Sequence, residues 1–206
     1  MALHNQINKQ KLIAYVCFSG IAISAPSFAD DGMQASKSYV QFDQSGQLTR
    51  PTGYREWIFV GTPLTPNDMN NGKAAFPEFH NVYIDPASWG HWKKLGEFPD
   101  DTIIVKELVS VGSKQAPSGN GYFQGEYIGL EAMVKSGQRF PKAPGNWGFF
   151  RFTIENSELL HSSAKAQPGE NCQTCHQTHA AKDQVFTQFY PVLRAAAGKG
   201  QAGTGR

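Results

Sequence analysis

Apolar side chains gather in short runs between residues 50 and 155, and turn residues such as glycine, proline and asparagine separate the runs. This pattern is typical of β-strands. It predicts five strands, at residues 56–60, 81–84, 102–111, 122–134 and 147–154. Because no crossover helix separates most of the runs, we expect neighbouring strands to pair antiparallel.

Two parts of the chain depart from this pattern. Asp85 followed by Pro86 predicts the start of a short helix that extends through Trp89, Trp92 and Lys94. Residues 159–165 are compatible with a helix, and four later apolar residues recur at helical spacing and predict core packing: Val185, Phe186, Phe189 and Leu193. We therefore expect an α+β fold, with a mainly antiparallel β-sheet of about five strands, flanking helices and a helical C-terminal segment.

The first 29 residues have the pattern of an export signal. Lys9 and Lys11 precede an apolar run at residues 12–25, and a small-x-small sequence ends at Ala29. The run is too short to cross a bilayer comfortably. We expect a signal peptide over residues 1–29, cleaved near Ala29, and one domain over residues 30–206 that ends in a disordered tail, residues 198–206.

Removal of this signal changes the charge and the cysteine count. The chain has 19 Lys+Arg, 17 Asp+Glu and three cysteines. Residues 1–29 contain two lysines, no acid and Cys17, so 17 residues of each charge and two cysteines remain. A near-neutral protein has no electrostatic basis for binding nucleic acid or an anionic membrane surface.

The two remaining cysteines lie in the sequence CQTCH at residues 172–176. Cys-x-x-Cys-His is the attachment signature of a c-type haem. Cys172 and Cys175 lie on one helical turn and can each add to one vinyl group of a porphyrin, and the adjacent His176 can bind the iron. We expect the haem-attachment segment at residues 156–197, and covalent haem on an exported protein indicates a bacterial periplasm.

Two other interpretations use the same residues. A thioredoxin-like redox pair would need a βαβ context, which the surrounding sequence does not offer. A zinc site could be assembled from Cys172, Cys175, His176 and His179. However, Cys175 and His176 are neighbours in the sequence and are poorly placed to face one ion together.

The motif alone does not distinguish electron transfer, gas binding and catalysis. An electron carrier usually fills the sixth iron position with a methionine or a second histidine, whereas a gas or a substrate needs it open. None of the candidate ligands has a distinctive flanking pattern: Met33, Met69, Met133, His80, His91, His161 and His179.

Two charged residues interrupt apolar strand runs. Lys106 lies in the run 102–111, where alternation places apolar residues on both faces. A lysine there is costly unless it is paired or used, or else the strand is an edge that the lysine protects from aggregation. Glu131 is either a solvated residue or a carboxylate beside the haem that takes protons from a substrate.

Seven motifs in one order resemble the cytochrome P460 family and cover nearly all of the chain after residue 30. They are YREW at 54–57, VYIDP at 82–86, VKELVSVG at 105–112, GNGYF at 119–123, PGNW at 144–147, CQTCH at 172–176 and FYPVLR at 189–194. The resemblance implies a periplasmic homodimer with one haem c per chain, and a covalent bond from a lysine to a porphyrin meso carbon. It also implies oxidation of hydroxylamine and handling of nitric oxide, with nitrous oxide or nitrite as product and a soluble c-type cytochrome as electron acceptor.

By position, the resemblance makes Cys172 and Cys175 the attachment residues, His176 the iron ligand and Lys106 the cross-linking lysine, with an open distal site. His80 lies where family members tend to carry arginine.

The distal carboxylate of the family falls on Glu131 or on its neighbour Ala132. With Glu131 in the pocket, the chain has a base; with Ala132 there, oxidation would be slow or absent. Two alternatives stay open, a nitric-oxide-binding protein of the same fold without the cross-link and a plain electron carrier.

Overall fold

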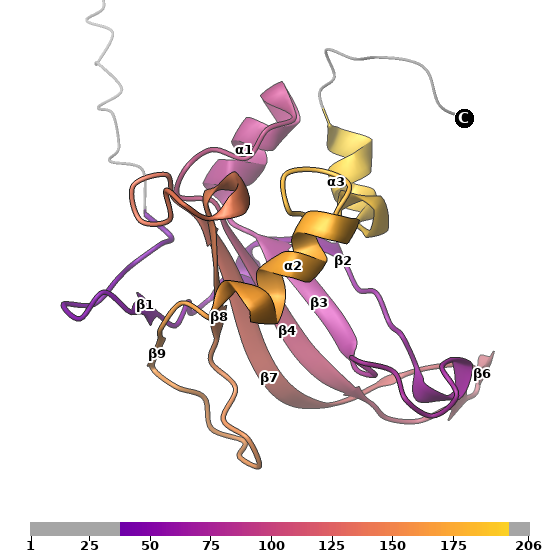
Figure 1. Cartoon of the computed structure of the whole chain (residues 1–206). Helices are drawn as coiled ribbons and strands as arrows, with labels where there is room; N and C mark the ends of the chain where they lie inside the picture. Colours follow the sequence, from indigo (N-terminus) through magenta and orange to yellow (C-terminus); the bar gives the residue numbers. More distant parts are fainter. Residues whose placement is uncertain (1–37, 198–206) are drawn as a thin grey trace, which may run out of the picture. The chain divides into compact units, whose positions relative to one another are not determined.

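The computed structural model describes residues 38–197, which form a five-stranded antiparallel sheet with three α-helices (Figure 1). The strand order is β2 (Ile58–Gly61), β3 (Phe79–Ile84), β4 (Ile103–Val111), β7 (Gln124–Lys135) and β8 (Trp147–Arg151). The helices are α1 (Pro86–Leu95), α2 (Gly169–His179) and α3 (Pro191–Ala196). The predicted α+β fold with its antiparallel sheet is confirmed.

Short elements complete the described chain. β1 (Leu48–Thr49) pairs with β9 (Ser163–Ala164), and β5 (Gln115–Ala116) pairs with β6 (Gly119–Asn120) inside the predicted turn-rich segment. The 3-10 helices are η1 (Tyr54–Glu56), η2 (Asn67–Met69), η3 (Pro144–Asn146) and η4 (Thr187–Phe189).

Some predictions concern parts of the chain outside the described residues. The signal peptide at 1–29, its cleavage near Ala29, the tail at 198–206 and the candidate ligand Met33 all lie there. Within residues 38–197, no helix is both long enough and apolar enough to cross a membrane.

Each face of the sheet packs against its own apolar core. On one face, side chains of the sheet pack against α1 and α3, and the buried residues include Val82, Ile84, Trp92, Ile104, Met133, Phe149 and Leu193. On the other face, the buried residues include Leu48, Val105, Leu130, Ala132, Val134, Phe150 and Phe152. Because side chains alternate along a strand, successive residues in the middle of β4 or β7 pack into different cores.

Asp85 begins α1, as its sequence context predicts, and also joins this helix to the sheet. Its carboxylate caps α1 by accepting from the backbone N–H of Ser88 at 2.8 Å, and it accepts from the N–H of Ile103 at 3.0 Å. From the middle of α1, Trp92 Nε1 donates to the carbonyl of Leu193 in α3 at 2.9 Å. One capping residue and one tryptophan thus connect β4, α1 and α3.

β4 is the central strand, with β3 on one side and β7 on the other. The interpretation of Lys106 as an aggregation guard on an edge strand is therefore wrong. Its backbone is paired on both sides, to Val82 in β3 and to Glu131 in β7. The side chain of Lys106 must find its partner on a covered sheet, which makes that partner informative.

Two helical predictions for the C-terminal region are wrong. Residues 159–165 contain β9 and no helix, because their backbone pairs with β1. The stripe that starts at Val185 is split into η4 and α3, since Pro191 opens a new helix. Val185 and Leu193 are buried as expected, but Phe189 is 58% exposed, so it does not pack in the core.

Candidate haem site

The haem-attachment motif lies on α2, in agreement with a helical attachment segment (Figure 1). Cys172 and His176 are four residues apart and therefore share a side of the helix. Both are partly buried, whereas Cys175 is exposed, and neither cysteine forms a disulfide. Cys172 packs against the core cluster of the helical face of the sheet.

The ring of His176 lies between two phenylalanines. Its centroid is 4.6 Å from that of Phe149 in β8 and 4.7 Å from that of Phe186. Its Nδ1 lies 2.6 Å from the carbonyl oxygen of Gln184. A carbonyl only accepts, so Nδ1 carries the proton and Nε2 keeps its lone pair. Burial lowers the pKa of His176, which favours the neutral imidazole that metal ions bind.

The chemistry of this donor set separates haem from its rivals. Burial, with a contribution from Glu131, raises the pKa of the Cys172 thiol, whereas a redox-active Cys-x-x-Cys pair needs a lowered one. Among residues 38–197, no three His, Cys, Asp or Glu side chains come together as a metal ion would require. This finding argues against the zinc interpretation that included His179.

The packing of α2 also fits a bound prosthetic group. The helix has 11 residues and none of them is buried. An isolated helix of this length is marginal in water and normally depends on packing. Two thiols and one neutral imidazole on such a helix match the set that a c-type haem uses, and the macrocycle would give the helix its packing partner.

Lys106 and Glu131 form an ion pair on the helical face of the sheet. They are opposite each other in the register of β4 and β7, and Lys106 Nζ is 2.7 Å from Glu131 Oε2. Each side chain is 27% exposed. The ring of Phe76 lies 5.2 Å from Lys106 Nζ. The pair is thus shielded on one side and accessible on the other.

The structure assigns the two candidate carboxylate positions to opposite faces. Ala132 is buried in the core that contains Val105 and Leu130, away from α2. Glu131 shares the face of Lys106, and the charges of both residues influence the pKa of His176 and of Cys172. Of the two neighbours, Glu131 is the one that lies on the side of the attachment motif.

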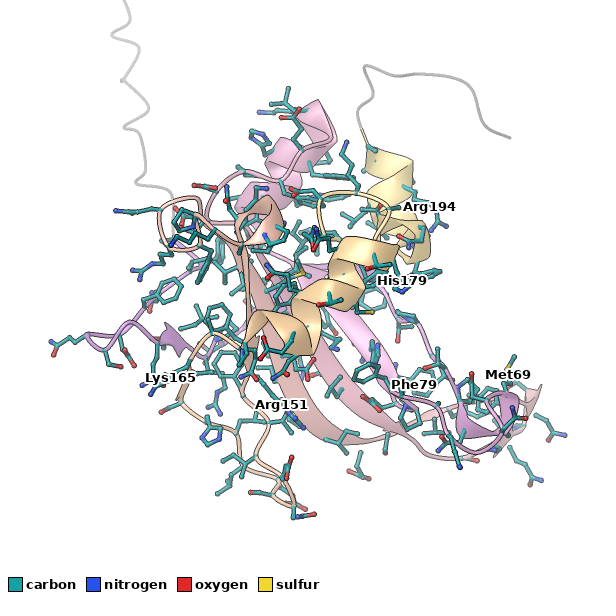
Figure 2. All side chains as sticks on the ribbon, viewed as in Figure 1. Met69, Phe79, Arg151, Lys165, His179 and Arg194 are labelled. Atoms are coloured by element: carbon teal, nitrogen blue, oxygen red, sulfur yellow. The ribbon has the colours of Figure 1, made fainter. Side chains whose placement is uncertain are left out.

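The other predicted ligands are scattered over the molecule. Met69 ends η2, and Figure 2 shows it well away from His179 on α2. Met133 is buried in the core cluster of the helical face.

His80 is on β3, where its Nε2 lies 3.4 Å from Glu78 Oε1. His91 is on α1, and His161 is exposed before β9.

Sequence reasoning missed three neighbours of the site. Phe76 and Phe149 contact Lys106 and His176, yet each is one phenylalanine among 14 and nothing in its flanking sequence marks it. Gln184 contributes its backbone carbonyl, which any residue could supply. Only the three-dimensional arrangement reveals these contacts.

Comparison with known proteins identifies the family of the chain. A family model described as Cytochrome P460 matches residues 51–187, which include the five-stranded sheet, Lys106, Glu131 and the haem motif. No curated protein matches the chain. The match covers well over half of the chain and includes each residue of the site just described. The chain therefore belongs to the cytochrome P460 family, and it is a haem oxidoreductase.

Proposed function

We propose that this chain is a periplasmic c-type cytochrome that oxidises hydroxylamine to nitrous oxide or nitrite and also handles nitric oxide. Membership in the cytochrome P460 family supports the haem and the nitrogen chemistry. The observation that carries the proposal is the 2.7 Å contact between Lys106 Nζ and Glu131 Oε2. It lies on the sheet face against which Cys172 and His176 pack, so one face holds an amine, a carboxylate and the attachment motif.

In this proposal Cys172 and Cys175 hold the haem through thioether bonds. Each thiol adds its S–H across one vinyl group, so the step needs no oxidant and releases nothing. His176 presents Nε2 to the iron because Gln184 holds Nδ1. When bound, the haem supplies an iron coordination position for the nitrogen of hydroxylamine and a route for its electrons.

Lys106 is proposed to bond through Nζ to a meso carbon of the porphyrin. The new C–N bond replaces one N–H and one C–H, so two protons and two electrons leave and a two-electron oxidant such as hydrogen peroxide must take the electrons. Nζ first has to lose the extra proton of its ammonium form, and Glu131 lies 2.7 Å away to accept it. A bonded amine carries no ammonium charge, so its burial in a central strand costs less.

Glu131 is proposed as the general base for the substrate. Two hydroxylamine molecules give one nitrous oxide and one water with the loss of four protons and four electrons, so the site must repeatedly accept protons. A carboxylate that is 27% exposed can take a proton from a bound substrate and pass it to solvent. The electrons pass to a soluble c-type cytochrome.

The location and the assembly state rest on the sequence. The export pattern of residues 1–29 supports the periplasm, and the resemblance to the family is the basis for proposing a homodimer. The resemblance to the family is also the basis for proposing small ligands and a protein acceptor as partners, and the near-neutral charge of residues 30–206 gives no electrostatic basis for nucleic acid or an anionic membrane surface.

Substitution of Lys106 tests the proposal. The Lys106→Ala variant should keep its haem through Cys172 and Cys175 but show the visible spectrum of an ordinary c haem, without the long-wavelength Soret band that the cross-linked protein should have when reduced. Lys114→Ala is the matched control, because Lys114 also forms an ion pair, with Asp68 at 2.6 Å. Cys172→Ala or Cys175→Ala should weaken haem retention much more.

An unchanged spectrum in the Lys106→Ala variant would contradict the cross-link. It would favour the second candidate function, a nitric-oxide-binding cytochrome in which Lys106 keeps its ion pair with Glu131. That protein would show an ordinary high-spin haem, in contrast to the low-spin six-coordinate haem of an electron carrier.

A further inference from the structure

The turn that holds His176 is built from two residues in an unusual conformation. Lys182 and Val185 are paired across the turn, and the residues between them, Asp183 and Gln184, have φ angles of 45° and 63°. Left-handed backbone costs roughly 1–2 kcal/mol for a residue with a side chain. Aspartate followed by glycine is a preferred pair for such a turn, so Asp183 is tolerated at its position, whereas Gln184 stands where glycine is usual and needs support from its surroundings.

That support comes from β7 and from the start of β8. Lys135 Nζ lies 2.7 Å from Asp183 Oδ2 and donates to the carbonyl of Gly145 at 2.9 Å. Trp147 Nε1 donates to Asp183 Oδ1 at 3.3 Å. The side chains of Lys135 and Asp183 are 16% and 26% exposed, so water screens this pair less than an ordinary surface pair.

Gly145 completes the arrangement. It has a φ of 62°, and a Cβ placed on it would lie 2.7 Å from Asp183 Oδ1 and 2.9 Å from Trp147 Cδ1. The PGNW motif at residues 144–147 therefore has a physical role: its glycine lets the turn approach, and its tryptophan holds the aspartate. The aspartate precedes the residue whose carbonyl meets His176 Nδ1 at 2.6 Å.

We propose that Lys135, Asp183 and Trp147 are positioning residues that fix the carbonyl of Gln184 on Nδ1 of His176 and so set the reduction potential of the haem iron. The inference rests on the proposed function, in which His176 is the iron ligand. A firm hydrogen bond at Nδ1 fixes the orientation of the ring and increases its basicity, as partners of metal-bound histidines generally do. A more basic ligand favours ferric iron, so loss of the support raises the midpoint potential.

The test uses the full-length protein with its covalent haem. Asp183→Asn removes the charge but tolerates left-handed backbone, and Lys135→Met removes the partner. Each should shift the ferrous-to-ferric ratio at a fixed ambient potential about tenfold toward ferrous, which is the lower end of the effects on metal affinity or activity that loss of such a partner has. A tenfold change in this ratio corresponds to about 59 mV for one electron. The iron–histidine stretching frequency, read by resonance Raman of the ferrous protein, should fall.

Controls separate this role from general stability. Lys135→Arg keeps the charge and should restore most of the potential and the stretching frequency. Asp68→Asn and Lys114→Met remove an ion pair of similar length, 2.6 Å, whose side chains are 47% and 58% exposed, and should change neither readout.

Two results would overturn the inference and are distinguishable from each other. If wild-type protein shows no iron–histidine band, the haem ligation in the proposed function fails, and this inference fails with it. If wild-type protein shows the band but Asp183→Asn and Lys135→Met shift the potential no more than Asp68→Asn does, the positioning role alone is refuted.

Discussion

Lys106 and Glu107 are neighbours in the central strand, but they lie on opposite faces of the sheet and in different environments. The Glu107 side chain is 5% exposed and accepts hydrogen bonds from Tyr54 Oη at 2.8 Å, Arg55 Nε at 2.7 Å and Asn81 Nδ2 at 3.2 Å. Lys106 is 27% exposed and pairs with Glu131, whose side chain is equally exposed. The same strand therefore holds one charge in a closed hydrogen-bond network and another in an open pair.

The difference distinguishes a charged residue that stabilises the fold from one that can take part in a reaction. A buried carboxylate with three donors has used most of its acceptor capacity, and removing it would leave buried donors without partners. The Lys106–Glu131 pair is more exposed than Glu107, so it can exchange protons with solvent or a ligand. Glu107 is accordingly expected to stabilise the fold, and Glu131 is expected to serve the chemistry.

The largest expected effect is on catalysis. Glu131→Gln should lower the rate of hydroxylamine oxidation roughly 10²- to 10⁴-fold, because the amide cannot accept protons. The free energy of unfolding should change less than in Glu107→Gln, because a Lys106 amine bonded to the haem carries no charge that Glu131 must neutralise. Steady-state assays with an artificial electron acceptor and urea unfolding measure the two quantities. Glu126→Gln, at an exposed position of the same strand, is the control, and a rate within about twofold of wild type would refute the base assignment.

The next largest effect is on stability, from the opposite face. Glu107→Gln should lower the free energy of unfolding by about 2 kcal/mol, because Tyr54 and Arg55 lose a charged acceptor. The visible spectrum of the haem and the rate of hydroxylamine oxidation should not change. A variant as stable as Glu126→Gln in urea would show that the negative charge of Glu107 contributes nothing to stability.

Alkaline pH provides a third comparison. Burial raises the pKa of Tyr190 to about 12, and burial together with the hydrogen bond to Glu107 raises the pKa of Tyr54. A phenol whose pKa rises on folding stabilises the fold fully below its unfolded pKa near 10, and this contribution is lost as the pH rises through the folded pKa. Tyr190 should therefore cost roughly 2 kcal/mol of stability between about pH 10 and pH 12.

The two tyrosines should respond differently to the loss of Glu107. Glu107→Gln should lower the pKa of Tyr54 and leave that of Tyr190 unchanged, since burial alone raises the latter. Ultraviolet absorbance of tyrosinate follows both ionisations, and Tyr54→Phe identifies which step belongs to Tyr54. Equal shifts of both tyrosines would mean that the fold, and not the hydrogen bond, had changed.

The smallest effect is expected at Arg55. Its side chain is 63% exposed, and its guanidinium lies over the rings of Tyr54 at 5.6 Å and Tyr127 at 5.4 Å. Arg55→Lys keeps the charge but loses the planar group that stacks and donates to Glu107. Urea unfolding should reveal a loss of about 1 kcal/mol or less, and a larger loss than in Glu107→Gln would reverse the roles assigned to the two residues.

The comparison also shows what the sequence could predict. Alternation along β4 places Lys106 and Glu107 on opposite faces, the CQTCH spacing identifies the attachment residues, and Asp85 before a proline marks a helix start. These features depend on neighbours in the chain. Which face α2 covers depends on packing between distant segments, so sequence alone could not choose between Glu131 and Ala132.

Long-range features account for the failed predictions as well. Lys106 is compatible with an edge strand until β3 and β7 are placed on either side of it. Helical spacing at residues 185–193 is interrupted by Pro191, so that Phe189 faces solvent. The carbonyl of Gln184 has no sequence signal, because its position depends on Lys135 and Asp183, which are 48 residues apart.

Peptide mass spectrometry of the digested, purified protein measures the central claim most directly. If Lys106 is bonded to the haem that Cys172 and Cys175 hold, the peptide with Lys106, the peptide with the CQTCH motif and one haem will be detected as a single covalent species. Its mass will be that of the three parts less two hydrogens. A free Lys106 peptide of unmodified mass, beside a haem-bearing CQTCH peptide, would contradict the claim.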